Sequence, residues 1–182
     1  MGTTAAMLYI KNNIYTVCNI GDSPIFLLRD GELKTLSVEH TEKASYEAIF
    51  KKKAEPGRKF PLTQCLGGDM DDMLIEPHVL QGELMENDIF LLCSDGISDL
   101  ITETELQDIL SCGEELPLIA SELEKRALAK GGKDNLTALC VQILPEQNQA
   151  KHVAKEIFSA LGLLAILTAA GSLLGQLFSL LL

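Results

Sequence analysis

The sequence predicts an α+β fold in which antiparallel sheets and helices form separate layers. Short apolar segments separated by turn residues occupy positions 5–37. After residue 99 two segments follow the helical period of apolar residues, and a final apolar segment ends at residue 144. Strands, then a helix pair, then one more strand is an order typical of an α+β domain.

Two β-hairpins are predicted within residues 5–37. The segments "AAMLYI" and "IYTVCNI" flank a polar turn at Lys11–Asn13. The segments "IFLL" and "ELKTLS" flank Asp30 and Gly31, a strong signal for a two-residue hairpin turn. We therefore expect four short, mostly antiparallel strands in this part of the chain.

The middle of the chain combines a helix, a loop and a weak strand. Residues 41–52 carry small and apolar residues at helical spacing, with Thr41 as the predicted N-cap. Residues 51–72 are rich in Gly, Pro and charge, so they predict a loop. Residues 73–80 predict a strand that Pro77 interrupts, as at a sheet edge or a bend.

The later elements are predicted more strongly. Thr102 followed three positions later by Glu105 is a capping box that starts a helix, and Gly131 marks the end of a second one. These elements are a buried strand within 84–94, helices at 102–112 and 115–131, and a last strand at 135–144.

The C-terminal segment has the composition of a membrane span. Residues 157–182 contain no charged side chain over 26 positions, and a bilayer needs roughly 20 residues of apolar helix. Lys151 and Lys155 precede this segment and favour a cytoplasmic head. The alternatives are a buried core helix or a helix bound to a partner. We thus expect a domain at 1–144, a linker at 145–156 and a single-pass anchor at 157–182.

The net charge and the cysteines limit the classes of partner and compartment that are expected. The 15 basic and 26 acidic residues give a formal net charge of −11, which argues against nucleic acid as a partner. Of the five cysteines, Cys18, Cys93 and Cys140 lie in apolar segments. They are interpreted as small buried residues of a reducing compartment rather than as a disulfide framework.

Four aspartates lie at or near the ends of predicted buried strands. Asp22 and Asp95 each follow one, Asp134 precedes one, and Asp99 lies one turn beyond Asp95. Such carboxylates are costly beside an apolar sheet unless a cation or a donor offsets them, and Mg²⁺ and Mn²⁺ take oxygen ligands. Each aspartate taken alone is better explained as a turn or capping residue, because Asp-Gly and Gly-Asp are common turn dipeptides. The shared setting of the four favours a divalent metal site.

Several motifs together resemble one known family. They are, in order, "GTTA", "NIGDSPIFLLRDGELKTLSVEHT", "LGG", "DIFLLCSDGISDLI" and "GGKDNLTALCVQI". In order and spacing, they are similar to the metal-dependent serine/threonine protein phosphatases of the PPM type (protein phosphatase 2C-like), and the resemblance covers residues 1 to about 144. It implies a two-layer antiparallel β-sandwich flanked by helices, and hydrolysis of phosphoserine and phosphothreonine proteins by metal-activated water.

The resemblance also implies site residues. Asp95 and Asp134 match ligands of the two catalytic Mg²⁺ or Mn²⁺ ions, and Asp22, Asp95 and Asp99 match the positions that hold a possible third ion. His40 matches a family histidine, for which a structural role is the favoured interpretation. No catalytic residue beyond the metal ligands is implied.

The sequence also departs from the family pattern. The family's Arg/Glu/Asp motif and its "DGxGG" motif, which supplies the aspartate that bridges both metals, precede "GTT" and do not occur in these 182 residues. We therefore expect an incomplete sandwich, equivalent to the C-terminal portion of the phosphatase domain, that is inactive as this chain alone. The alternatives are a noncatalytic, membrane-anchored pseudophosphatase or interaction module, and a gene fragment or miscalled start.

Overall fold

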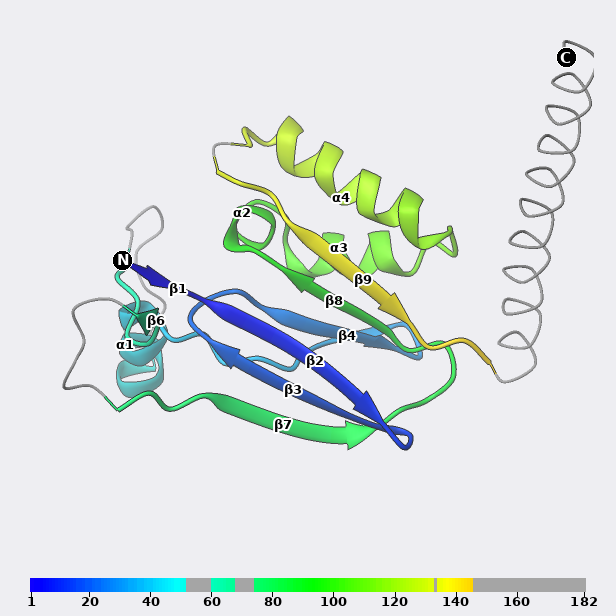
Figure 1. The fold of residues 1–182 in the computed structure, drawn as a ribbon. Helices are drawn as coiled ribbons and strands as arrows, with labels where there is room; N and C mark the ends of the chain where they lie inside the picture. The colour runs from blue at the N-terminus through cyan, green and yellow to red at the C-terminus, as the bar shows by residue number, and fades with distance from the viewer. Residues whose placement is uncertain (52–59, 68–73, 133, 146–182) are drawn as a thin grey trace, which may run out of the picture. The chain divides into compact units, whose positions relative to one another are not determined.

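The computed structural model describes residues 1–51, 60–67, 74–132 and 134–145, and its elements follow the predicted order. Antiparallel pairing joins the strands (Figure 1). The strands are β1 (Gly2–Thr3), β2 (Ala5–Lys11), β3 (Ile14–Ile20), β4 (Ile25–Arg29), β5 (Glu32–Thr35), β6 (Leu66–Gly67), β7 (His78–Glu83), β8 (Ile89–Cys93) and β9 (Ala138–Gln142). The helices are α1 (Glu42–Phe50), α2 (Asp95–Ser98), α3 (Glu103–Leu110) and α4 (Leu116–Ala129).

Both predicted hairpins are present, and their turns explain why they form. Asn12 and Asn13 join β2 to β3 with φ of 49° and 62°, and Asp30 and Gly31 join β4 to β5 with φ of 53° and 79°. Positive φ at both central residues gives the turn whose twist matches that of the flanking strands, and Asn, Asp and Gly tolerate it best. The two hairpins belong to different sheets, which local turn signals do not specify.

Two sheets form the centre of the fold. The first sheet has the order β2-β3-β7, and the second has the order β5-β4-β8-β9. Strand β8 is buried along its whole length because both of its faces pack against other layers. Phe90 and Leu92 face the first sheet, where Phe90 meets Tyr15 edge-on at 5.1 Å, while Leu91 and Cys93 face the helices. At about 1.5–3 kcal/mol for each large apolar side chain buried, β8 is a major source of stability.

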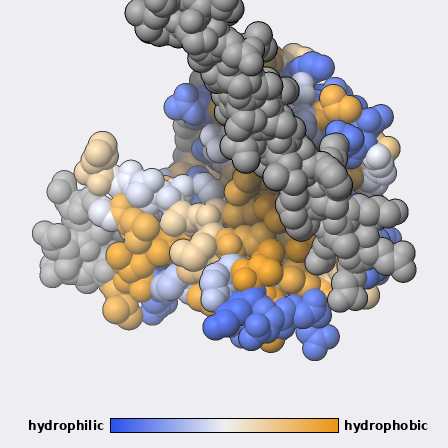
Figure 2. Space-filling model, turned by 45° about the vertical axis from the view of Figure 1, so that its right-hand side comes forward, coloured by the Kyte–Doolittle hydropathy of each residue, from blue (hydrophilic) through white to orange (hydrophobic). Residues whose placement is uncertain are grey.

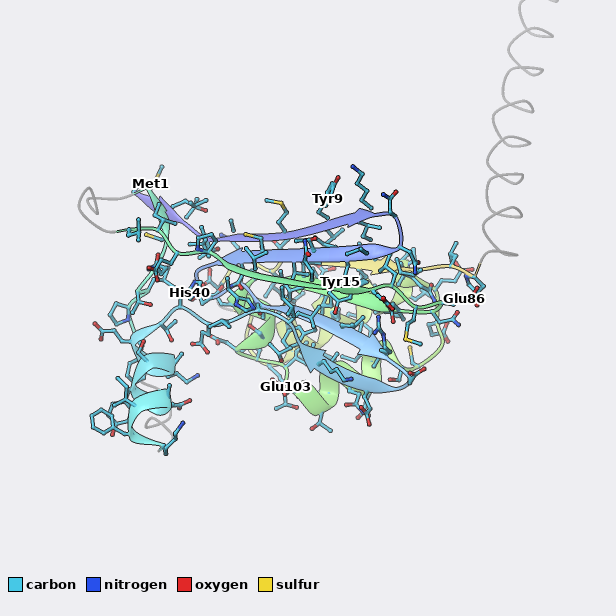
Figure 3. All side chains as sticks on the ribbon, turned by 90° about the horizontal axis from the view of Figure 1, so that it is seen from below. Met1, Tyr9, Tyr15, His40, Glu86 and Glu103 are labelled. Carbon is cyan, nitrogen blue, oxygen red and sulfur yellow. The ribbon has the colours of Figure 1, made fainter. Side chains whose placement is uncertain are left out.

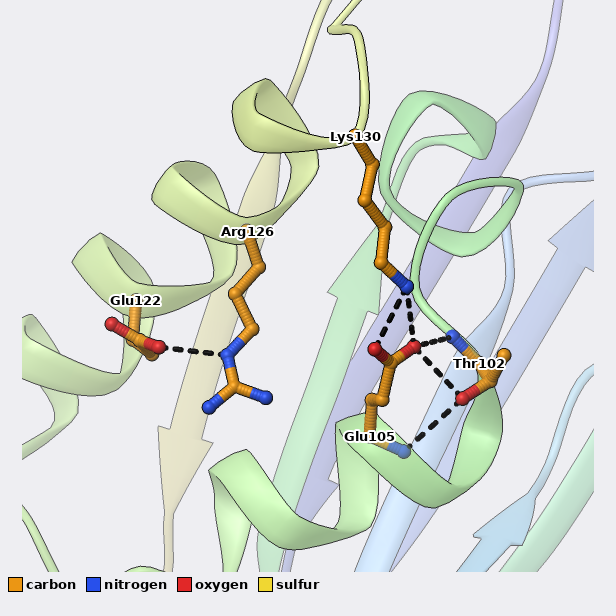
Figure 4. Close-up of polar contacts among 5 residues, drawn as sticks. All are labelled: Thr102, Glu105, Glu122, Arg126 and Lys130. Atoms are coloured by element: carbon orange, nitrogen blue, oxygen red, sulfur yellow. Dashed lines mark hydrogen bonds and ion pairs between the residues drawn. The ribbon is translucent and has the colours of Figure 1, made fainter.

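Helices α3 and α4 cover one face of the second sheet. Buried residues of α3 and α4, such as Leu106, Ile109 and Leu123, pack against β4 and β8. The predicted capping box at the start of α3 is confirmed, because Thr102 Oγ1 accepts from the amide of Glu105 and the Glu105 carboxylate accepts from the amide of Thr102. Lys130, just beyond α4, donates to the same carboxylate at 2.6 and 2.8 Å (Figure 4).

The outer face of the first sheet has no helix over it among the described residues. Figure 3 shows Tyr9 pointing away from the second sheet and Tyr15 pointing into the space between the sheets; they are 55% and 6% exposed. Figure 2 shows hydrophobic residues in several places on one side of the described molecule, at the left and in the centre of the view. Exposed apolar residues whose strand positions place them on this outer face are Met7, Tyr9, Ile14 and Val79.

One predicted strand needs correction. Pro77 does not interrupt a strand at 73–80; β7 begins directly after it and continues to Glu83, because it pairs with β3 from Asn19 to Ile14. The short elements β6, within the loop predicted at 51–72, and α2 were not predicted. The helix predicted at 41–52 is confirmed as α1, and Thr41 caps it; none of its residues is buried.

The linker and anchor predictions fall largely outside the described residues. The structure describes the chain only up to residue 145, so the predicted span at 157–182 and most of the linker at 145–156 are untested. Among the residues that are described, none forms a helix long and apolar enough to cross a membrane.

Candidate functional site

A hollow lined by several carboxylates lies between the segment after β3, the hairpin of β4 and β5, the turn of α2 and the start of α3. It has a volume of about 300 Å³, and we call it the acidic hollow. Three of the four predicted aspartates, Asp22, Asp95 and Asp99, line it together although they come from two distant parts of the sequence. Glu39 and Glu103 add two more carboxylates to its lining, and Lys43 is the one basic residue among the described residues that line it.

A tight turn after β3 positions Asp22. Gly21 has φ of 96°, a conformation that side chains rarely adopt, and a Cβ there would lie 2.3 Å from Cγ2 of Thr4. The Gly21 amide donates to Nδ1 of His40 at 3.1 Å, and the His40 amide donates to the carbonyl of Gly21 at 3.0 Å. Ser23 shares a hydrogen bond of 2.8 Å with Thr4 on the other side of Asp22. The turn is thus fixed from both sides.

His40 has a structural role in this turn. Burial lowers its pKa below 6.5, and the charge of His78 lowers it further. The ring is therefore neutral at pH 7, and its Nδ1 can accept a hydrogen bond from the Gly21 amide. The structural interpretation made from the sequence agrees with this arrangement.

The end of β8 positions Asp95 and Asp99. The chain leaves the buried strand at Cys93 and forms the single turn of α2, in which the Asp99 amide donates to the carbonyl of Asp95 at 2.8 Å. Spacing of four residues in a helical turn places both carboxylates on one side. The Asp95 carboxylate also accepts from the amide of Gly96 at 2.8 Å, which limits its orientation. The two carboxylates that follow the buried strand are thus directed by the turn of α2 toward the acidic hollow.

Asp134 is not among the residues that line the acidic hollow. It is exposed, and its carboxylate accepts from the amide of Asn135 at 2.8 Å. Its segment nevertheless lies against the start of α2, because Ser94 Oγ donates to the carbonyl of Asn135 at 3.1 Å and Ser94 donates its amide to Thr137. Its role as a metal ligand remains a prediction.

The electrostatics of the acidic hollow favour a cation. Burial is the main cause that raises the pKa of Asp22 above 3.8, and the negative charge of Asp95 is the next. A hydrogen bond to its own backbone opposes this shift, while Glu39 and Asp99 add to it. The carboxylates thus repel one another in a partly desolvated place, which a bound cation would relieve.

The donor chemistry fits Mg²⁺ or Mn²⁺, which prefer carboxylate oxygens. Within the described part of the chain, however, no group of three or more His, Cys, Asp or Glu side chains is close enough together to hold a metal ion. These residues provide separate carboxylates around one hollow rather than a finished coordination shell.

Sequence reasoning missed Glu39, Lys43 and Glu103. Glu39 directly precedes the matched His40, and Glu103 opens the capped helix α3, so neither follows a strand as the predicted aspartates do. Glu39 accepts from the Thr41 hydroxyl at 2.8 Å and Glu103 accepts from the hydroxyl of Thr35 at 3.3 Å. Glu103 lies in the first turn of α3, where an acidic residue is expected for its interaction with the helix dipole alone. Glu39 lies in the loop before α1 and Lys43 lies on its first turn, and neither belongs to a pattern that indicates a site.

The sequence of this chain matches the model of one known protein family. Residues 1–138 match the model described as protein phosphatase 2C. The chain belongs to the protein phosphatase 2C family. The family resemblance of the sequence motifs is thereby confirmed, and so is a mixed fold of helices and antiparallel sheets.

Relatives of the protein phosphatase 2C family are named as bacterial serine/threonine phosphatases. The serine/threonine phosphatase Stp of Listeria welshimeri is 32% identical over 146 residues, which are 78% of this chain and 57% of that protein. The chain thus spans little more than half the length of this relative.

Solved structures show the same fold. The serine/threonine phosphatase PstP of Mycobacterium tuberculosis matches with a TM-score of 0.68 and 28% identity over 79% of this chain and 61% of that one. A structure of the catalytic domain of PstP in complex with two manganese ions matches with a TM-score of 0.66 and 29% identity, covering 78% and 59% of the two chains.

Proposed function

We propose that this chain serves in a metal-dependent phosphatase that hydrolyses phosphoserine and phosphothreonine in proteins. The observation that carries the proposal is the acidic hollow, which is lined by Asp22 from one part of the sequence and by Asp95 and Asp99 from another. Membership of the protein phosphatase 2C family and the manganese ions of the PstP structure support it. The chain's acidic character agrees with a cation as the ligand.

The described residues suggest a division of roles. Asp95 and Asp99 would hold Mg²⁺ or Mn²⁺ from the turn of α2, and Asp22 would hold it from the turn after β3. Asp134, which does not line the acidic hollow, would join them from the segment that Ser94 contacts. When bound, such ions would act as Lewis acids that activate water for in-line attack on a phosphoester. The hydrogen bonds between His40 and Gly21 would keep Asp22 in place.

Calorimetric titration of the full chain with Mn²⁺ tests the proposal. We expect saturable binding that weakens at least about tenfold in Asp95→Asn and in Asp22→Asn, since each removes one charged ligand. Asp134→Asn tests in the same way the predicted ligand that does not line the acidic hollow. Asp108→Asn is the matched control, because Asp108 is an exposed carboxylate of α3 outside the acidic hollow. If all four variants bound Mn²⁺ with the affinity of the parent chain, the acidic hollow would not be the metal site.

We also propose that the chain alone does not hydrolyse phosphoesters. Support comes from the absence of a three-ligand cluster among the described residues and from the limited share of each relative that the chain spans. Mn²⁺-dependent hydrolysis of a small aryl phosphate by the purified chain would contradict this part. Absence of both Mn²⁺ binding and hydrolysis would instead favour a noncatalytic interaction module.

A last part of the proposal is that residues 157–182 tether the protein to a membrane with a cytoplasmic head. Its support is the charge-free composition of that segment, with Lys151 and Lys155 before it. Retention of the chain in carbonate-washed membranes, and its release in a variant with Leu163 and Leu173 both changed to Lys, is the expected result. Recovery of the parent chain in the soluble fraction would contradict the tether.

A further inference from the structure

The outer face of the first sheet carries a regular pattern across its three strands. Strand β3 is the central strand, with β2 on one side and β7 on the other. The pairing register places the side chains of this face in three rows that cross the strands. The rows are Met7, Cys18 and Val79, then Tyr9, Thr16 and Gln81, then Lys11, Ile14 and Glu83. We call these nine residues the three-row face, and Figure 3 shows its Tyr9 pointing away from the second sheet.

The three-row face is apolar at one end and carries charges only at the other. Met7 and Val79, at the two sides of the first row, are 57% and 54% exposed. Lys11 and Glu83 lie at the two sides of the last row, and both are exposed. They stand two strands apart, about 10 Å, and neither side chain forms an ion pair among the described residues. The face therefore presents exposed apolar side chains together with one unneutralised charge of each sign.

This pattern is complementary to itself when a second copy lies face to face with the first. A twofold axis along β3 places β2 of one copy over β7 of the other and keeps each row opposite the same row. Lys11 then faces Glu83 of the second copy, and this pair occurs twice. The residues on the axis meet their own counterparts. Two of these, Thr16 and Cys18, are small, which suits the spacing of about 10 Å between packed sheets.

We propose that the chain forms a symmetric homodimer through the three-row face, with β3 of each copy along the twofold axis. The charges favour a second copy as the occupant, because it brings the opposite charge to both positions at once and an apolar row to the apolar row. Nine residues are fewer than the roughly 20–30 a side of a standard interface. The dimer is therefore weak and reversible, with a dissociation constant of about 10–100 μM.

The dimer does not depend on the proposed function. None of the nine residues lines the acidic hollow, so Mn²⁺ binding and self-association are measured separately. At chain concentrations below the dissociation constant the three-row face is open, and at higher concentrations it is covered. Hydrogen exchange in β2 and β7 should therefore slow as the chain concentration rises, while exchange in β4 and β8 should not change.

Light scattering of the full chain at about 1–300 μM, in one nonionic detergent throughout, tests the dimer. We expect at least about tenfold weaker association in Lys11→Glu and in Glu83→Lys, because each change places two pairs of like charge in the interface. The double variant with both changes should associate like the parent, since opposite charges face each other again. Lys125→Glu, at an exposed position of α4, is the matched control. Circular dichroism checks that all variants fold.

Cys18 gives a second measurement, because the twofold axis brings it next to its counterpart. A short bifunctional thiol reagent should link two copies of the parent chain. The product should also form in Cys112→Ser, whose exposed cysteine lies outside the three-row face, and it should be lost in Cys18→Ser.

Three results would overturn the proposal. A chain that stays monomeric up to the highest concentration would leave the three-row face to a different polypeptide. A dimer that forms equally well in Lys11→Glu and Glu83→Lys would use another surface. A double variant that associates no better than the single variants would mean that Lys11 and Glu83 do not face each other.

Discussion

Asp88 shows how much one buried residue can hold together. It is 1% exposed, and its carboxylate accepts from Arg29 at 2.6 and 2.8 Å and from the amide of Met85 at 2.9 Å. Arg29, in β4, also donates to the carbonyl of Glu83 at the end of β7, so the pair joins the two sheets. We expect Asp88→Ala to lower the free energy of unfolding by about 2–3 kcal/mol, since it leaves a partly buried arginine without its partner.

Urea unfolding followed by circular dichroism measures this change. Asp108→Ala, at an exposed position of α3, is the control, and its effect should stay within about 0.5 kcal/mol. A loss below about 1 kcal/mol in Asp88→Ala would show that Arg29 and the Met85 amide find other partners in water.

The candidate site was partly predictable at this scale. Asp22 and Asp95 could be found because each directly follows a buried strand, and Asp99 because it lies one turn later. Glu39 could not, because its approach to the acidic hollow depends on the paired hydrogen bonds between Gly21 and His40, which join residues 19 positions apart. A contact of that kind leaves no local periodicity.

At the scale of elements, the junction of α3 and α4 is sensitive to pH. The hydrogen bond from Lys130 is the main cause that lowers the pKa of Glu105 from 4.5 to about 2, and bonds from Thr102 add to it (Figure 4). The folded state thus binds this proton less tightly than the unfolded state does. The stabilisation is complete above about pH 4.5 and is lost as the pH falls toward 2.

Thermal unfolding at several pH values checks this. Glu105→Gln should melt below the parent at pH 7, and the difference should shrink as the pH falls from 4.5 to about 2. Glu124→Gln, at an exposed position on α4, should melt like the parent throughout. A difference between Glu105→Gln and the parent that is the same at pH 7 and pH 2.5 would mean that the junction does not depend on the charge.

Elements defined by local signals were predictable, and those defined by distant pairing were not. The capping box at Thr102 and the turn at Asp30 and Gly31 are complete within a few residues, so the sequence alone places α3 and the second hairpin. Strand β6 exists because Leu66–Gly67 pairs with β1, more than sixty positions earlier. The bounds of β7 follow from its pairing with β3 rather than from Pro77.

At the scale of the described domain, the two sheets differ in how they are covered. The second sheet lies between the first sheet and the helices, whereas the outer face of the first sheet is open among the described residues. The sequence predicted most of the longer strands and helices, but it could not assign hairpins to sheets or helices to one face. Those choices depend on which apolar faces meet, which is a property of the whole assembly.

This asymmetry predicts a gradient of stability across the domain. Residues 25–28 of β4 and all of β8 are at most 8% exposed, so their hydrogen bonds open only when both neighbouring layers separate. Strands β2 and β7 have one open face, and local opening there costs less free energy. We expect hydrogen exchange of the chain alone to be at least about tenfold slower in β4 and β8 than in β2 and β7, measured by mass spectrometry on proteolytic fragments. Strand β5, an edge under the same helices, should fall between them. Equal protection of β2 and β8 would contradict this gradient and would mean that the open face is covered in solution. The substitution Val79→Lys, on that face, should then restore the difference in exchange rate between β2 and β8.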